Sequence, residues 1–151
     1  MARNLNRRDM IRGTACALGL FQLPYMAWAE IADMDAAIKD MFGETPINEG
    51  RVSLTIPPLS ENGYSVSLDV EADSPMTPDD YVKRIAIFSE RNPIPLIAEY
   101  HFTPNSGIAR LSSKIRLGGT QSVHAIAQMS DGSLWSTSAK TFVTLAACVV
   151  L

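Results

Sequence analysis

Short runs in which apolar and polar residues alternate dominate the sequence from Arg51 onward. Alternation with a period of two places the apolar side chains on one face of a β-strand, so each run predicts a half-buried strand. Val52, Leu54 and Ile56 form the first run, and Pro57 ends it. Further runs span residues 64–70, 81–89, 97–103, 108–117, 122–129 and 140–151. Seven or eight such strands are typical of an all-β chain that folds as an immunoglobulin-like antiparallel β-sandwich.

One short helix is expected before the strands. Apolar residues recur there at helical spacing, and Gly43 follows as a natural C-terminal stop. The apolar positions of this helix are Ile31, Met34, Ile38, Met41 and Phe42.

Turn residues indicate how the later strands connect. Asp131-Gly132 lies between Met129 and Leu134, a pattern typical of a two-residue hairpin turn. Gly118-Gly119 is expected to connect two other strands.

The first 29 residues have the three regions of a secretory signal. The pair Arg7-Arg8 precedes an apolar stretch at residues 14–21, and Ala27-Trp28-Ala29 offers a small-x-small cleavage pattern. Paired arginines before such a stretch favour the twin-arginine export route. The apolar stretch is shorter than the roughly 20 residues that cross a bilayer, so we expect no retained membrane anchor. Residues 1–29 are therefore predicted to be a signal peptide, and residues 30–151 a single exported domain of the periplasm.

The charge of the predicted mature domain argues against nucleic-acid binding. Of 13 basic and 16 acidic residues, four basic and one acidic residue lie in positions 1–29, which leaves 9 basic and 15 acidic residues. Such an acidic chain lacks the basic surface that attracts phosphate backbones. It also lacks the polybasic segment that binds anionic membranes.

One cysteine remains after the signal is removed, because Cys16 leaves with it and Cys148 stays. A single cysteine cannot form an internal disulfide. In an exported protein it therefore indicates either a reactive thiol or a bond to a partner. Cys148 is the fourth residue from the end of the sequence, where chains are usually exposed. An inert cysteine that packs as a small apolar residue stays open as the alternative.

Other chemistry is less well supported by the sequence. His101, His124, Met129 and Cys148 include the ligand types of a blue-copper site, but only three residues follow Cys148, too few for the usual ligand loop. Asp79-Asp80 follows a proline in a polar turn, so these carboxylates are expected to be solvated. We predict no metal site, no cofactor and no catalytic residues.

Several ungapped segments resemble the SoxY family, which carries sulfur in periplasmic thiosulfate oxidation. They are DSPMTPDDYVK (residues 73–83), IFSERNP (87–93), HFTP (101–104) and MSDGSLW (129–135). The resemblance implies a sandwich-fold carrier, not an enzyme, that forms a heterodimer with SoxZ. It also implies transient contacts with a c-type cytochrome, a sulfate-releasing hydrolase and a sulfane dehydrogenase. Sulfur would be attached to the cysteine near the C-terminus, which is Cys148 here.

The residues around Cys148 depart from the family pattern. The family has Gly-Gly-Cys-Gly-Gly, whereas this tail has Ala146 and Ala147 before the cysteine and Val149 and Val150 after it. Valine is stiff and bulky where glycine supplies freedom and little width. A divergent binding or assembly subunit with an unloaded cysteine is therefore the alternative to a working carrier. An apolar tail that folds back onto the domain and buries the thiol is also open.

Overall fold

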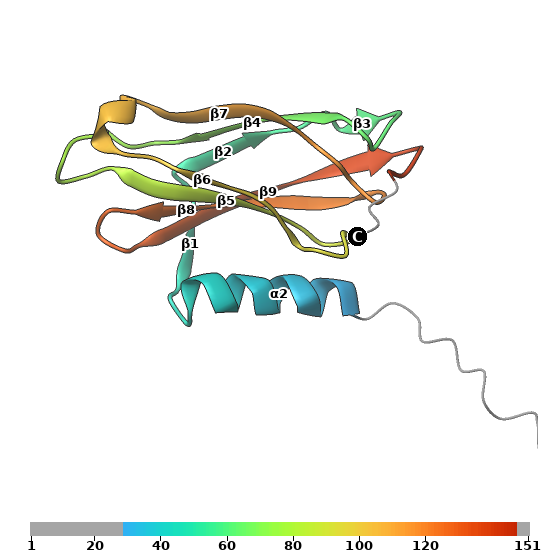
Figure 1. Ribbon diagram of the computed structural model, residues 1–151, viewed down its shortest axis with the longest axis horizontal. Coiled ribbons are helices and arrows are strands. Elements are labelled where there is room, and N and C mark those ends of the chain that lie inside the picture. The colour runs from blue at the N-terminus through green and yellow to red at the C-terminus, as the bar shows by residue number, and fades with distance from the viewer. Residues whose placement is uncertain (1–28, 148–151) are drawn as a thin grey trace, which may run out of the picture.

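The computed structural model describes residues 29–147 as two β-sheets packed face to face, with one helix against the outside of the larger sheet (Figure 1). The predicted fold class, a β-sandwich of immunoglobulin-like type preceded by one short helix, is confirmed. Within the described residues no helix has the length and hydropathy needed to cross a membrane.

The larger sheet has the strand order β1-β9-β8-β5-β6, and β3 also pairs with β9. Its strands are β1 (Ile47–Glu49), β3 (Leu59–Ser60), β5 (Val82–Ser89), β6 (Leu96–His101), β8 (Gln121–Met129) and β9 (Leu134–Val143). The smaller sheet has the order β2-β4-β7, and it is antiparallel throughout. Its strands are β2 (Val52–Thr55), β4 (Val66–Ala72) and β7 (Ala109–Ile115), and a short 3₁₀ helix, η1 (Pro104–Ser106), precedes β7.

The main core lies between the two sheets and follows from the alternating pattern. Along β4 every second side chain, from Val66 to Ala72, is buried, while the residues between them are more exposed. On β8 the inward side chains Val123, Ala125 and Ala127 pack into the same core. Burial of these alternating apolar faces is the main force that holds the sheets together.

Helix α2 (Ala29–Phe42) covers a second apolar cluster on the outer face of the larger sheet. Met34 and Phe42 are buried there against Phe88 and its neighbours on β5, β8 and β9. The helix ends where predicted, because Gly43 adopts φ +69° and its amide donates to the Lys39 carbonyl over 2.8 Å. Strands β5 and β8 are therefore covered on both faces, which explains why their patterns are more continuously apolar than those of β2 and β4.

Arg84 fastens the end of this helix to the sheet. Its Nη2 donates to the last-turn carbonyl of Met41 over 3.1 Å, and its guanidinium carbon lies 4.6 Å from the centre of the Phe42 ring. The same side chain donates to Glu99 and to Gln128 on the two strands that flank β5. A cation at a helix C-terminus is favourable because carbonyl groups there lack intrahelical partners.

The structure corrects the predicted strands at three places. β1 and β3, which the alternation did not reveal, are three and two residues long, and both pair parallel with β9. All other strand pairs of the sandwich are antiparallel, so the parallel pairs are confined to the edge of the larger sheet at β9. The final strand, β9, spans Leu134–Val143, so only residues 140–143 of the strand predicted at 140–151 lie in it and residues 144–147 do not. Residues 148–151 lie outside the described residues. Residues 144–147 instead turn back toward the ends of β4 and β7.

The hairpin at Asp131-Gly132 is present, but its loop is longer than two residues. The amide of Met129 donates to the Ser133 carbonyl over 2.9 Å, and the amide of Gly132 donates to the Met129 carbonyl over 3.1 Å. Gly132 has φ +89°. The turn thus has three loop residues with glycine in the left-handed position. Asp131 stabilises it by accepting hydrogen bonds from the amide and hydroxyl of Ser133.

Candidate functional site

The base of the C-terminal tail, residues 145–147, is the described part of the chain nearest in sequence to the candidate thiol. Cys148, Val149 and Val150 lie outside the described residues. Ala146 is exposed, whereas Ala147 is only 6% exposed. The residue directly before Cys148 is thus part of the packed domain.

Three backbone hydrogen bonds fix this base. The amide of Gly63 donates to the Leu145 carbonyl over 2.8 Å, and the amide of Ala147 donates to the Leu117 carbonyl over 3.0 Å. The amide of Leu117 in turn donates to the Gly63 carbonyl over 2.9 Å. The loops that precede β4 and β8 therefore meet the tail in one continuous backbone network.

Gly63 is required by the close approach of these three segments. A Cβ atom at this position would lie 2.4 Å from the Leu117 carbonyl oxygen and 2.9 Å from the Ala147 nitrogen. Real Cβ atoms do not approach backbone atoms this closely, so any side chain here would push the segments apart. The contact of Gly63 with the tail joins segments far apart in the sequence, so no local pattern reveals it.

Asn92 and Gln121 hold the loop that receives the tail. The Asn92 side chain donates to the Arg116 carbonyl over 2.9 Å and accepts from the amide of Gly118 over 3.0 Å. Gln121, which is 2% exposed, accepts from the amide of Arg91 and donates to Asn92 and to the Gly119 carbonyl. Gly118 and Gly119 lie between β7 and β8, so the predicted connection between two strands is confirmed. Segment 87–93 contributes Arg91 and Asn92 to it.

A partly buried contact between Glu90 and His124 lies nearby on the outer face of the larger sheet. Glu90 accepts from the amide of Ser122 over 3.0 Å and lies 3.2 Å from Nε2 of His124. Burial alone would raise the pKa of Glu90, but the hydrogen bonds from Ser122 and His124 outweigh it and place the pKa below its ordinary value of 4.5. The structure therefore favours the charged carboxylate.

Glu90→Gln is expected to reduce the loss of stability in acid. A carboxyl group whose pKa is lowered by folding stabilises the protein above its unfolded pKa, and that contribution disappears as the pH falls through the folded value. Urea unfolding of wild type and variant at about pH 6 and about pH 3.5 measures the difference. The wild type is expected to lose more stability between these two pH values than Glu90→Gln. Equal losses would contradict the role of Glu90, and the exposed Glu61→Gln is the matched control.

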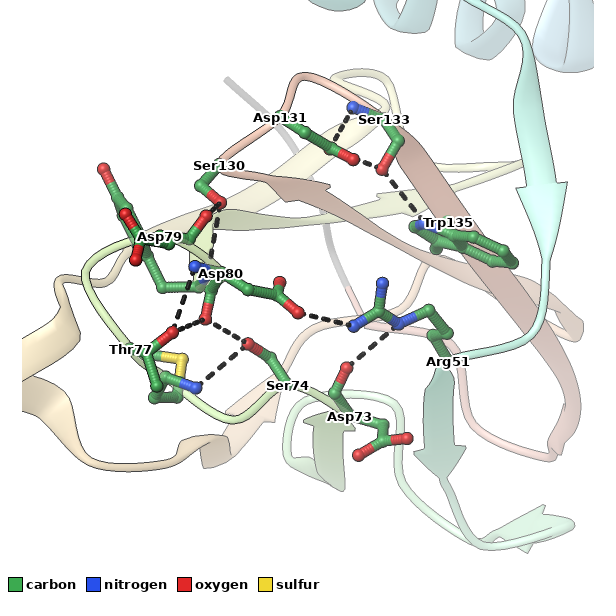
Figure 2. A network of polar contacts seen from close by, with 12 residues as sticks. Arg51, Asp73, Ser74, Thr77, Asp79, Asp80, Ser130, Asp131, Ser133 and Trp135 are labelled. Carbon is green, nitrogen blue, oxygen red and sulfur yellow. Dashed lines mark hydrogen bonds and ion pairs between the residues drawn. The ribbon is translucent and has the colours of Figure 1, made fainter.

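The opposite end of the sandwich joins two other segments that carry the family resemblance (Figure 2). Ser130 donates through its hydroxyl to the Asp79 carbonyl over 3.0 Å and accepts from the amide of Tyr81. Arg51 binds the Asp73 carbonyl over 3.2 Å and lies 3.7 Å from the Asp80 carboxylate. These contacts join segments 73–83 and 129–135. β8 and β9 run from this end of the sandwich to the end that carries the tail base. The network therefore lies far from the tail base and stabilises the fold at the opposite end.

Asp79 and Asp80 lie in the turn that this network supports. Asp79 is exposed, and the carboxylate of Asp80 faces the Arg51 guanidinium (Figure 2). Arg51 has φ +53° and its guanidinium lies 5.6 Å from the centre of the Trp135 ring. The two carboxylates thus belong to a surface turn, as the sequence indicated.

The described candidate copper ligands do not converge. His101 is exposed at the end of β6 and contacts Glu99, whereas His124 contacts Glu90. Met129 points into the core on the face of β8 opposite to His124. Within residues 29–147 no group of three or more His, Cys, Asp or Glu side chains is placed to hold a metal ion.

Comparison with known proteins connects this arrangement to sulfur oxidation. A family model described as sulfur oxidation protein SoxY matches residues 38–148, so the match includes Cys148 and stops there. The solved structure of the sulfur carrier protein SoxY from Chlorobium limicola f. thiosulfatophilum superposes with a TM-score of 0.63 and 26% identity, covering 76% of this chain and 98% of that chain. No curated protein matches the sequence.

Superoxide reductases share the fold at lower identity. The neelaredoxin of Ignicoccus hospitalis has a TM-score of 0.55 at 14% identity and covers 62% of this chain and 80% of that chain. A putative superoxide reductase from Thermotoga maritima has a TM-score of 0.54 at 16% identity, with coverage of 66% and 93%. These likenesses concern the sandwich alone. The family match, by contrast, spans most of the sequence, so this chain belongs to the SoxY family of sulfur oxidation proteins.

Proposed function

We propose that this chain carries intermediates of thiosulfate oxidation covalently on the thiol of Cys148. The strongest support is that the family match runs to Cys148, directly after a residue that is buried and hydrogen-bonded to the domain. The hydrogen bonds around Gly63 hold the chain to the domain one residue before this thiol.

Thiol chemistry fits reversible loading. In the proposed first step the cysteine sulfur and the sulfane sulfur of thiosulfate form an S–S bond, which gives a cysteine S-thiosulfonate. Two electrons pass to a c-type cytochrome and the thiol proton goes to water. Water then attacks the terminal sulfonate sulfur, releasing sulfate and leaving a persulfide on the cysteine. Such bonds are covalent but are exchanged readily by thiolates, as a carrier requires.

The chain itself acts in this proposal as a substrate for partner enzymes. SoxZ is the proposed stable partner in a heterodimer, and the cytochrome, a sulfate-releasing hydrolase and a sulfane dehydrogenase are transient partners. Strands β6 and β7 lie at sheet edges, where a second β-protein can pair with free backbone groups. Export by the twin-arginine route would place the complex in the periplasm.

Cys148→Ser tests the proposal in cells that lack their own copy of this chain. The variant is expected to restore no thiosulfate oxidation, because the serine hydroxyl cannot form the S–S bond. Its stability is expected to stay within about 0.5 kcal/mol of wild type, and it is expected to bind SoxZ. Thiosulfate consumption and co-purification of SoxZ measure the two properties separately. Oxidation at the wild-type rate by the serine variant would rule out the carrier role.

A binding or assembly subunit with an idle cysteine is the second candidate, favoured by the alanine and valine residues that replace the family glycines. It predicts that Cys148→Ser supports thiosulfate oxidation fully, whereas deletion of the whole chain does not. The same experiment therefore separates the two functions.

A further inference from the structure

Four large apolar side chains are exposed beside the tail base. In the described part of the chain seven such side chains are exposed, so more than half of them gather here. They are Leu59 (59% exposed), Tyr64 (42%), Phe142 (54%) and Leu145 (59%), which we call the apolar strip. Single exposed apolar side chains are ordinary, but a cluster of them is typical of a surface that another molecule covers.

Backbone contacts around the tail base bring the strip together. Leu59 and Phe142 are paired residues of β3 and β9, so their side chains lie side by side on one face of the sheet. The amide of Gly63 donates to the Leu145 carbonyl over 2.8 Å, and Tyr64 directly follows Gly63. The strip therefore belongs to the same two segments that hold the tail base.

The tail base limits how far the thiol can lie from this surface. Ala147 is 6% exposed, and its amide donates to the Leu117 carbonyl over 3.0 Å. Cys148 follows directly, and consecutive Cα atoms lie only about 3.8 Å apart. An enzyme whose active site receives this thiol therefore has to approach the surface around Ala147. The nearest member of the strip, Leu145, is only two residues before Ala147.

We propose that the apolar strip is the docking surface for the enzyme that forms the S–S bond on Cys148, and that this enzyme carries apolar side chains around its active-site entrance. This inference rests on the proposed carrier function and adds the surface by which the loading enzyme binds the domain. Contact between two apolar surfaces is favourable because it removes both from water.

The position of the strip favours a transient partner over a permanent one. A protein that stayed bound to the strip would cover the surface next to the thiol and keep other enzymes from it. Interfaces of transient partners are also small, which matches four side chains better than a stable heterodimer does. The loading enzyme, which binds, reacts and leaves, meets both conditions.

Loading kinetics of the mature chain in its complex with SoxZ test this surface, with thiosulfate and the c-type cytochrome as reagents. The rate is measured from the mass of the Cys148 adduct at increasing concentrations of the complex. In the strip variant, Leu59→Ser with Phe142→Ser, KM for the complex is expected to rise about tenfold, while kcat changes by less than about twofold. An unchanged KM would overturn the proposal.

Three controls separate docking from other effects. Ile94→Ser with Ile108→Ser removes apolar side chains elsewhere, 51% and 49% exposed, and is expected to leave KM unchanged. Alkylation of Cys148 by iodoacetamide is expected to keep its wild-type rate in the strip variant, because a small reagent needs no docking surface. SoxZ is expected to co-purify with the strip variant. A changed alkylation rate or the loss of SoxZ would assign the strip another role and overturn the proposal.

A binding measurement distinguishes this inference from the carrier function. With Cys148→Ser the complex binds the cytochrome without reacting, and the strip variant is expected to raise its dissociation constant about tenfold. Weaker binding by the strip variant, in a chain that is never loaded, refutes the carrier function alone. Loading with KM and the dissociation constant unchanged refutes this inference alone. If Leu59→Ser with Phe142→Ser loses stability in urea, Tyr64→Ser with Leu145→Ser provides the same test.

Discussion

Gly63→Ala is expected to destabilise the protein by about 3 kcal/mol and to detach the tail base. The added Cβ would meet the Leu117 oxygen at 2.4 Å and the Ala147 nitrogen at 2.9 Å, both of them backbone atoms. Overpacking costs typically about 1–3 kcal/mol, and each lost hydrogen bond adds about 1 kcal/mol. Urea unfolding measures the loss of stability. Amide hydrogen exchange is expected to show that Ala147 and Leu117 lose protection.

Gly107→Ala is the matched control for this substitution. Gly107 has φ +71°, but a Cβ there meets no atom within 4 Å. The control variant therefore costs about 1 kcal/mol through backbone strain alone and leaves the exchange of Ala147 unchanged. Retained protection of Ala147 in Gly63→Ala would show that the glycine does not hold the tail.

Phe88→Ala is expected to cost about 3–5 kcal/mol and to loosen helix α2. Phe88 is fully buried, and its ring centre lies 6.5 Å from that of Phe42 on the helix. Removing it leaves a cavity where the helix contacts the sheet. Thermal or urea unfolding gives the stability, and exchange of the helix amides reports the loosening.

Phe142→Ala provides the comparison for Phe88. Its ring is 54% exposed, so the same truncation is expected to change stability by no more than about 0.5 kcal/mol. Similar losses in the two phenylalanine variants would contradict the assignment of Phe88 to the helix–sheet core.

Alternation predicted β2, β4 and β7 because these strands bury one face and expose the other. The run Val66–Ala72 illustrates this, with inward apolar and outward polar residues. β1 and β3 are too short to show a period, and their partner strand is distant in sequence. The end of β9 was misplaced because residues 144–147 are apolar or neutral, as a buried strand would be, yet bind loops at 60–63 and 117.

The candidate site was only partly predictable from the sequence. Cys148 was identifiable because the single cysteine of an exported chain cannot form an internal disulfide, which makes it a candidate reactive thiol. Gly63, Asn92 and Gln121 were missed as supports of the tail, since each acts through contacts with residues far away along the chain. Arg84 was missed for the same reason: its partners lie on α2, β6 and β8.

Loading of Cys148 is tested most directly by the intact mass of the mature protein from thiosulfate-grown cells, measured before and after treatment with a reductant. The carrier function predicts sulfur or sulfonate adducts that the reductant removes and that are absent from Cys148→Ser. An unmodified mass, in cells whose thiosulfate-oxidising enzymes are shown to be active, would contradict it.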